Sequence, residues 1–118
     1  MTPEAMRTRT KKFAVDVIRF AKQIPRTPIS DEITEQLTDS ASATASAYRA
    51  ACRARSKADF IYKLGNAIEE ADESALWLEI LMESDIWTAP PVKALWQEAD
   101  ELTRILVASR ETARGNRR

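Results

Sequence analysis

The chain has 118 residues, 44% of them hydrophobic, and its 18 basic and 18 acidic side chains give a formal net charge of zero. This length fits one domain with one hydrophobic core. Two glycines and five prolines supply too few turns for an all-β fold, a single cysteine excludes an intramolecular disulfide, and no apolar run reaches the roughly 18 residues of a membrane span.

The first helix is predicted over residues 4–24. Phe13, Val17 and Phe20 recur at four- and three-residue steps, which is the spacing of one face of an α-helix. Residues 25–28 begin and end with proline, and proline disfavours a helix both at its own position and at the one before it. We therefore expect the helix to end there.

Ser30 is the predicted N-cap of the second helix, with Asp31 and Glu32 in the first turn, where carboxylates interact favourably with the helix dipole. The helical periodicity continues to Ala51. Residues 40–47 in its middle are all serine, alanine or threonine. Such small side chains let a neighbouring helix approach closely.

Ser56 is the predicted N-cap of the third helix, over residues 57–84, and Asp59 three positions later nearly completes a capping box. An apolar stripe follows the whole segment. Gly65 within it either weakens the helix by about 1 kcal/mol relative to alanine or marks a close contact.

Pro90 and Pro91 precede the fourth helix, and Pro91 suits its first turn. The ends of the chain, about residues 1–5 and 113–118, are expected to fray. Four helices of about 20 residues with short connections must run antiparallel. The sequence therefore predicts an all-α fold, a single antiparallel up-down-up-down four-helix bundle domain over residues 1–118.

Residues 48–56, 63–65 and 77–79 form an ordered string of motifs: Tyr-Arg-Ala-Ala-Cys-Arg-Ala-Arg-Ser, then Lys-Leu-Gly, then Trp-Leu-Glu. In this order they resemble the bacterial four helix bundle protein family, first noticed as a reading frame within intervening sequences of large-subunit ribosomal RNA genes. The resemblance covers roughly residues 10–112.

The resemblance implies an antiparallel four-helix bundle that assembles as a homopentamer and has no known catalytic activity. A relative with this fold is the accessory protein of diversity-generating retroelements, which is pentameric and basic and works with a reverse transcriptase and nucleic acid. Our chain departs from the pattern in two ways: it is neutral, and residues 47–51 read Ala-Tyr-Arg-Ala-Ala in place of the usual Asn-Ile-Ala-Glu-Gly.

A basic cluster marks the junction of the second and third helices: Arg49, Arg53, Arg55 and Lys57. We predict that these residues bind nucleic acid as a phosphate clamp, with Tyr48 stacking on a base. The alternative is that the arginines pair with acidic groups of another helix or subunit while Tyr48 lies in the core.

Aromatic residues are the predicted subunit contacts: Tyr48, Trp77 and Trp87. Packing within the protomer is the alternative. Cys52 is expected to be a small core residue, although its arginine neighbours would favour a reactive thiolate.

The basic residues of the two chain ends should lie at the same end of the bundle and, repeated around a ring, form a cationic face: Arg7, Arg9, Lys11, Lys12, Arg110, Arg114, Arg117 and Arg118. Solvated tails are the alternative.

The absence of histidine narrows the chemistry. It removes the usual general base near neutral pH, every Ser-His-Asp or Cys-His arrangement and the His ligands of a di-metal carboxylate site. Basic residues without a long apolar stretch open the chain, so we expect no signal peptide and a cytoplasmic location.

These observations predict a non-enzymatic, oligomeric module without cofactor, metal, membrane or small-molecule substrate. It would bind RNA or DNA through its arginine-rich surfaces. The alternative is a protein–protein interaction scaffold in which the arginines serve subunit contacts.

Overall fold

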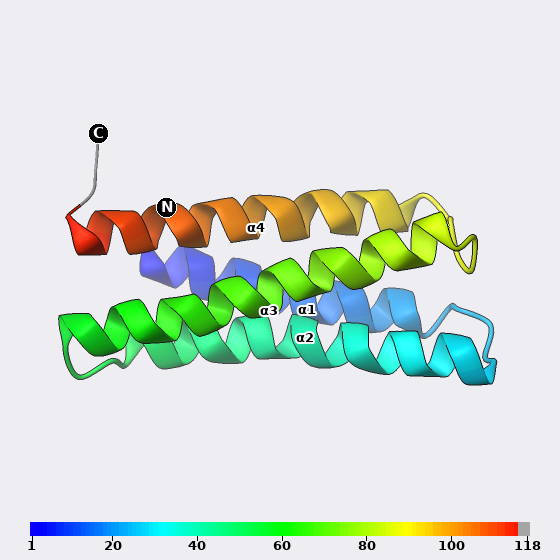
Figure 1. Cartoon of the computed structure of the whole chain (residues 1–118), viewed down its shortest axis with the longest axis horizontal. Helices are drawn as coiled ribbons and strands as arrows, with labels where there is room; N and C mark the ends of the chain where they lie inside the picture. Colours follow the sequence, from blue (N-terminus) through cyan, green and yellow to red (C-terminus); the bar gives the residue numbers. More distant parts are fainter. Residues whose placement is uncertain (116–118) are drawn as a thin grey trace.

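A computed structural model describes residues 1–115 and shows four helices: α1 (Pro3–Ala21), α2 (Pro28–Cys52), α3 (Lys57–Glu83) and α4 (Pro91–Arg114). They alternate in direction along a bundle of 45 × 26 × 20 Å (Figure 1). The predicted all-α, up-down four-helix bundle is therefore confirmed. In the described part of the chain, no helix combines the length and apolar character that crossing a bilayer requires.

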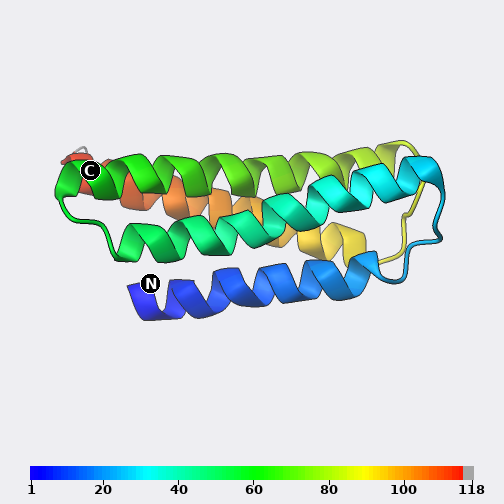
Figure 2. The same cartoon turned by 90° about the horizontal axis from the view of Figure 1, so that it is seen from below.

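Helices that follow one another in the chain pack side by side along their lengths, whereas α1 and α3 lie diagonally opposite, as do α2 and α4. The bundle closes between α1 and α4, and this is the pair with the fewest contacts of the four neighbouring pairs. Figure 2 shows α1 along one side of the molecule and α3 along the other.

The α2–α3 interface is built from small side chains. Ser40, Ala41 and Thr44 of α2 are buried, as are Ala71 and Ser74 of α3. The Ser74 hydroxyl lies 3.0 Å from the Ser40 hydroxyl, within hydrogen-bond distance. This agrees with the close approach expected from the serine- and alanine-rich centre of the second helix.

The predicted cap of α2 was wrong: Thr27, not Ser30, is the N-cap. The Thr27 hydroxyl accepts the backbone N–H of Ser30 at 3.0 Å, and the Ser30 hydroxyl accepts the backbone N–H of Thr27 at 2.8 Å. The helix begins earlier than expected because Pro28 occupies its first turn, where no backbone N–H is needed. The first helix also ends earlier, at Ala21 rather than near residue 24.

The predicted cap of α3 is confirmed. The Ser56 hydroxyl accepts the Asp59 backbone N–H at 3.0 Å, while the Asp59 carboxylate accepts the backbone N–H of Arg55 at 3.2 Å. Pro91 opens α4 as expected, without a side-chain cap. Of the ends expected to fray, α1 is helical from Pro3 and α4 through Arg114, and residues 116–118 lie outside the described residues.

Hydrogen bonds from a single arginine connect α1 to α4. The Arg9 guanidinium forms two hydrogen bonds to Glu98, at 2.7 and 2.8 Å, and a third to Glu101 at 2.8 Å. Only 24% of the Arg9 side chain and 30% of the Glu98 side chain are exposed. These hydrogen bonds, led by the one to Glu98, raise the pKa of Arg9 above its usual value, so the guanidinium stays charged throughout the accessible pH range.

Gly65 offers a first test of the packing. A Cβ atom built there would meet its nearest neighbour, Arg110 Nη1, at 3.9 Å, an ordinary van der Waals distance. We expect Gly65→Ala to raise the free energy of unfolding by about 0.5–1 kcal/mol in urea titrations, because glycine is entropically costly inside a helix. Gly115→Ala is the contrasting variant and should destabilise, since φ is 86° at Gly115. A loss of stability in Gly65→Ala would contradict the room for a Cβ atom at Gly65.

Arg9 gives a second test. Arg9→Lys keeps the charge but loses the planar fork, so we expect a loss of about 1–2 kcal/mol in unfolding free energy. In this variant, amide hydrogen exchange should speed up more in α1 than in α3, relative to the unchanged protein. Lys12→Ala removes the exposed Lys12–Asp16 pair and should cost less than about 0.5 kcal/mol. If Arg9→Lys is as stable as the unchanged protein, the hydrogen bonds of the Arg9 guanidinium do not stabilise the packing of α1 on α4.

Candidate nucleic-acid interface

The predicted basic cluster lies at one end of the bundle, where α2 ends and α3 begins. Arg49 is in the last turn of α2 and Arg53 is its C-cap residue. Arg55 lies in the connection and Lys57 is the first residue of α3. All four side chains are exposed. The green connection in Figure 1 marks this end, which also holds the start of α1 and the end of α4.

A fifth cation, from another helix, joins them. Arg7 of α1 lines a cavity of about 440 Å³ together with Arg49, Cys52 and Arg53. We call this cavity the arginine pocket, and the end of the bundle that carries Arg7, Arg49, Arg53, Arg55 and Lys57 the arginine end. The sequence suggested only that Arg7 belonged to a cationic face; its place beside Arg49 follows from the packing of α1 on α2.

No carboxylate lines the arginine pocket. Within residues 1–115, Arg7, Arg49 and Arg53 form no ion pair, whereas Arg9, Arg26 and Arg104 each have a carboxylate oxygen within 3.2 Å. Converging guanidiniums repel one another, and a bound anion offsets that repulsion. The pocket therefore has the charge and the concave shape of an anion site.

Tyr48 belongs to the core of the protomer and also lines a second cavity beside this pocket. Tyr48 is 5% exposed, as in the alternative that places it in the core, and its roles in base stacking and in a subunit contact stay predictions. Burial first, and then the neighbouring Cys52, raise the pKa of the Tyr48 hydroxyl to about 12, while Arg7 acts in the opposite direction.

A second cavity adjoins the arginine pocket and is more apolar. Its volume is about 360 Å³, and it shares Arg7 and Cys52 with the arginine pocket. Phe60, half-buried on α3, lines it. Phe60 thus joins Tyr48 as an aromatic side chain that lines this cavity with Arg7, although Phe60 stands several positions after the arginines in the sequence. Cys52 is half-buried between the two cavities.

The two tryptophans predicted as subunit contacts lie outside the arginine end. Trp77, in the second half of α3, is half-buried and its indole N–H donates to Glu73 at 3.2 Å. Trp87, in the connection at the opposite end, packs partly against the core, and its buried indole N–H has no hydrogen-bond partner among the described residues. Their role between subunits stays a prediction.

Most of the other basic residues of the chain ends are engaged. Arg9 binds Glu98 and Glu101, Lys12 pairs with Asp16, and both Arg110 and Arg114 approach Glu111. Arg117 and Arg118 lie outside the described residues. The cationic face expected from both chain ends is therefore represented at this end mainly by Arg7.

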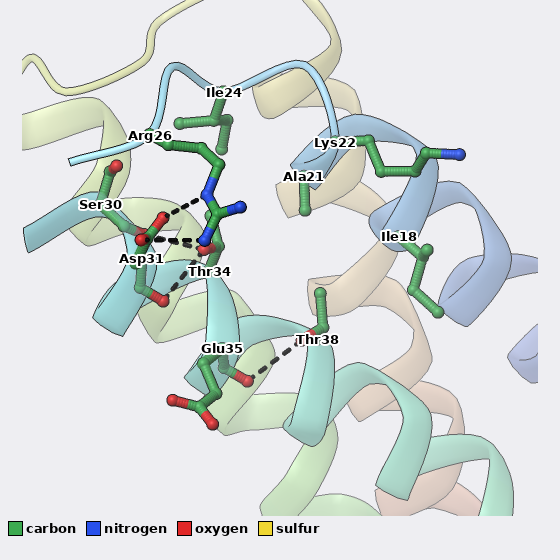
Figure 3. A pocket seen from close by; sticks show the side chains of 10 residues that line it. All are labelled: Ile18, Ala21, Lys22, Ile24, Arg26, Ser30, Asp31, Thr34, Glu35 and Thr38. Atoms are coloured by element: carbon green, nitrogen blue, oxygen red, sulfur yellow. Dashed lines mark hydrogen bonds and ion pairs between the residues drawn. The ribbon is translucent and has the colours of Figure 1, made fainter. Parts of the chain in front are cut away.

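Another cavity of the described structure lies between the end of α1 and the start of α2 (Figure 3). Its volume is about 480 Å³, and Arg26 reaches across it to Asp31 at 3.2 Å. Lys22 and Glu35 add one further charge of each sign, so this groove lacks the single-sign charge of the arginine pocket. Over residues 1–115, no group of cysteine and carboxylate side chains is placed to hold a metal ion.

Comparison with protein families shows which family the chain belongs to. Residues 5–108 match the model described as "23S rRNA-intervening sequence protein". The chain belongs to this family. The predicted resemblance is therefore confirmed, and the family assignment by itself gives no specific role.

A solved structure shows the same fold. It is a protein of unknown function from the S23 ribosomal protein family of Bacteroides thetaiotaomicron VPI-5482, which superposes with a TM-score of 0.81 at 24% identity. The match covers 94% of our chain and 99% of that one. At this identity the likeness supports the fold alone. No curated protein matches the chain.

The buried Tyr48 predicts an alkaline limit of stability. Its pKa is about 12 in the folded protein against 10.0 ordinarily, so the unfolded chain loses this proton first as pH rises. The contribution of Tyr48 to the free energy of unfolding is fully present below pH ~10 and is lost between pH ~10 and ~12, and a pKa difference of about 2 corresponds to roughly 3 kcal/mol. Tyr48→Phe should flatten this decline in urea titrations, whereas Tyr62→Phe, at an exposed tyrosine, should not. An unchanged profile in Tyr48→Phe would assign the decline to other groups.

Proposed function

We propose that this family member is a non-enzymatic, homopentameric module of the bacterial cytoplasm that binds the phosphate backbone of RNA or DNA at its arginine end. One observation carries the proposal: three guanidiniums from two helices line a single pocket without a carboxylate. A guanidinium presents two parallel N–H donors that match two phosphate oxygens, and such charge-assisted bonds are stronger than neutral ones.

The residues divide the work by position. Arg7, Arg49 and Arg53 would hold one phosphate group in the arginine pocket. Arg55 and Lys57, exposed at the same end, would contact neighbouring phosphates along the strand. Phe60, in the adjoining cavity, offers a ring face on which an unpaired base can stack. These contacts read charge and shape rather than base sequence.

Self-association adds to this mechanism. A single arginine end makes few phosphate contacts, so one copy alone would bind weakly. Linked copies bind a long strand at several points, and the second contact then occurs at a high effective concentration. The net charge of zero is compatible with this mode, because the acidic side chains gather elsewhere: residues 64–102 carry ten acidic groups and one basic group.

The proposal is tested by titrating labelled single strands and duplexes of RNA and DNA with the purified oligomer over a range of salt concentrations. Arg49→Glu/Arg53→Glu should reduce affinity at low salt by at least about tenfold and reduce the slope of log K against log salt by about 2, since each lost phosphate contact removes about one unit. Lys93→Glu, an exposed cation in the first turn of α4 at the other end of the bundle, is the matched control and should bind as the unchanged protein does.

Equal loss in Lys93→Glu would mean that binding follows overall charge and not the arginine end. Absence of binding by an intact oligomer at low salt would overturn the proposal and favour the alternative, a protein–protein interaction scaffold.

A further inference from the structure

The outer face of α1 and its C-cap residue, Lys22, carry a stripe of exposed residues: Lys11, Val15, Ile18 and Lys22. The steps between them are four, three and four, so all four side chains point the same way from the helix. Val15 is 39% exposed and Ile18 42% exposed, so two β-branched apolar side chains lie next to each other on the surface of a helix that has a core face of its own. Neither lysine pairs with a described carboxylate. We call this set the α1 stripe.

The outer face of α3 carries a stripe of the same length and opposite sign: Asp72, Leu76, Ile80 and Glu83. Its steps are four, four and three. Leu76 is 48% exposed, Ile80 is half-buried, and the two acidic ends are exposed. We call this set the α3 stripe. Each stripe thus places two apolar side chains between two like charges that are eleven positions apart, or about 16 Å along the helix.

The two stripes lie on different sides of one protomer. The helices α1 and α3 are diagonal in the bundle, their backbones do not approach closely within the described residues, and Figure 2 shows them along opposite sides. One copy therefore cannot bring its own stripes together. It can present both at once, each to a different neighbour.

Contacts within the protomer give the height of the α3 stripe along the bundle. The Ser74 hydroxyl meets the Ser40 hydroxyl at 3.0 Å, which sets α2 and α3 level at these residues. Because the two helices are antiparallel, moving two residues toward the start of α2 matches moving two toward the end of α3. Thr38 is therefore level with Leu76, and by the same count Thr34 is level with Ile80.

The α1 stripe lies at the same height. Ile18 lines one cavity with Thr34 and Thr38 (Figure 3), so it is level with a point between Leu76 and Ile80. The helices α1 and α3 run in the same direction. Counting along them from Ile18 therefore brings Lys11 close to the height of Asp72, and Lys22 close to the height of Glu83.

We propose that copies of this chain associate head to tail, with the α1 stripe of one copy packed on the α3 stripe of the next. Lys11 then meets Asp72, Lys22 meets Glu83, and Val15 and Ile18 cover Leu76. Because the stripes are level, a rotation about an axis parallel to the bundle brings them together without a shift along it. A head-to-tail contact of this kind builds a ring when the rotation closes.

The charges around the contact favour the same pairing. Glu69 and Glu79 extend the negative potential of α3 on either side of Leu76, and Arg19 extends the positive potential of α1 beside Ile18. Glu35 of α2, on the far wall of the α1–α2 groove, has the unfavourable sign and limits how far a neighbouring α3 can enter that groove. Opposite charges at fixed spacing select register and exclude pairing of like stripes.

The inference rests on the self-association in the proposed function and is independent of nucleic-acid binding. It is tested by measuring molar mass with size exclusion and light scattering, over a range of protein concentrations without nucleic acid. Lys11→Glu/Lys22→Glu should reduce the mass to that of one chain, and so should Asp72→Lys/Glu83→Lys, since each variant faces like charges. The variant with all four changes restores opposite charges and should recover the mass of the unchanged protein.

Lys93→Glu/Glu32→Lys exchanges two exposed charges outside both stripes and should leave the mass unchanged. Far-UV circular dichroism and melting confirm the fold of each variant. If a reversed pair fails to fold, Leu76→Gln at an exposed position provides the same readout and should also dissociate the assembly. The inference is overturned if the unchanged protein is a monomer throughout, if either reversal leaves its mass unchanged, or if the fourfold variant stays monomeric.

Failure of the two proposals can be told apart. Assembly that obeys the charge exchange in a protein that binds no nucleic acid would leave the stripes established and the proposed function refuted. If the assembly binds nucleic acid but its mass does not change in the charge-reversed variants, the proposed function stands and the pairing of the two stripes is refuted.

Discussion

The close packing of α2 on α3 is the constraint on which the rest of the molecule depends. Alanine and serine side chains line it, and two buried hydroxyls, of Ser40 and Ser74, meet across it. Small side chains hold the helix axes near each other, and a shift of one turn would separate the two hydroxyls, although each also has a carbonyl partner in its own helix. This register brings Arg53 and Phe60 to one end and sets the heights at which the outer faces of the bundle lie.

The helix α1 is held differently. It packs well on α2 but makes few contacts with α4, and there the Arg9 fork on Glu98 and Glu101 supplies the polar part of the attachment. Helices with fewer packed contacts open at lower free energy than the rest of a fold. The bundle is therefore best regarded as a firm hairpin of α2 and α3 with α4 packed on α3, to which α1 is attached along one side.

Much of this arrangement follows from local patterns in the sequence. Apolar periodicity identified all four helices, and the pair Ser56 and Asp59 identified the start of α3, because a cap is decided within one turn. The prediction of Ser30 as N-cap was wrong for a related reason. Ser30 is a good cap residue, but Pro28 fits the first turn of the helix, so the helix begins earlier and Thr27 is its N-cap. The basic cluster was found from spacing alone. Its partner Arg7, and the burial of Tyr48, depend on how α1 lies against α2, which no local pattern encodes.

The arginine pocket takes one of its three guanidiniums from the helix with the weakest attachment. An anion held by Arg7, Arg49 and Arg53 together binds only when α1 is docked, so occupancy of the pocket and docking of α1 are reciprocally linked equilibria. Docking of α1 strengthens anion binding by a certain free energy, and anion binding stabilises docked α1 by the same free energy. A bound anion at the arginine end would therefore stabilise the docked position of α1 against opening.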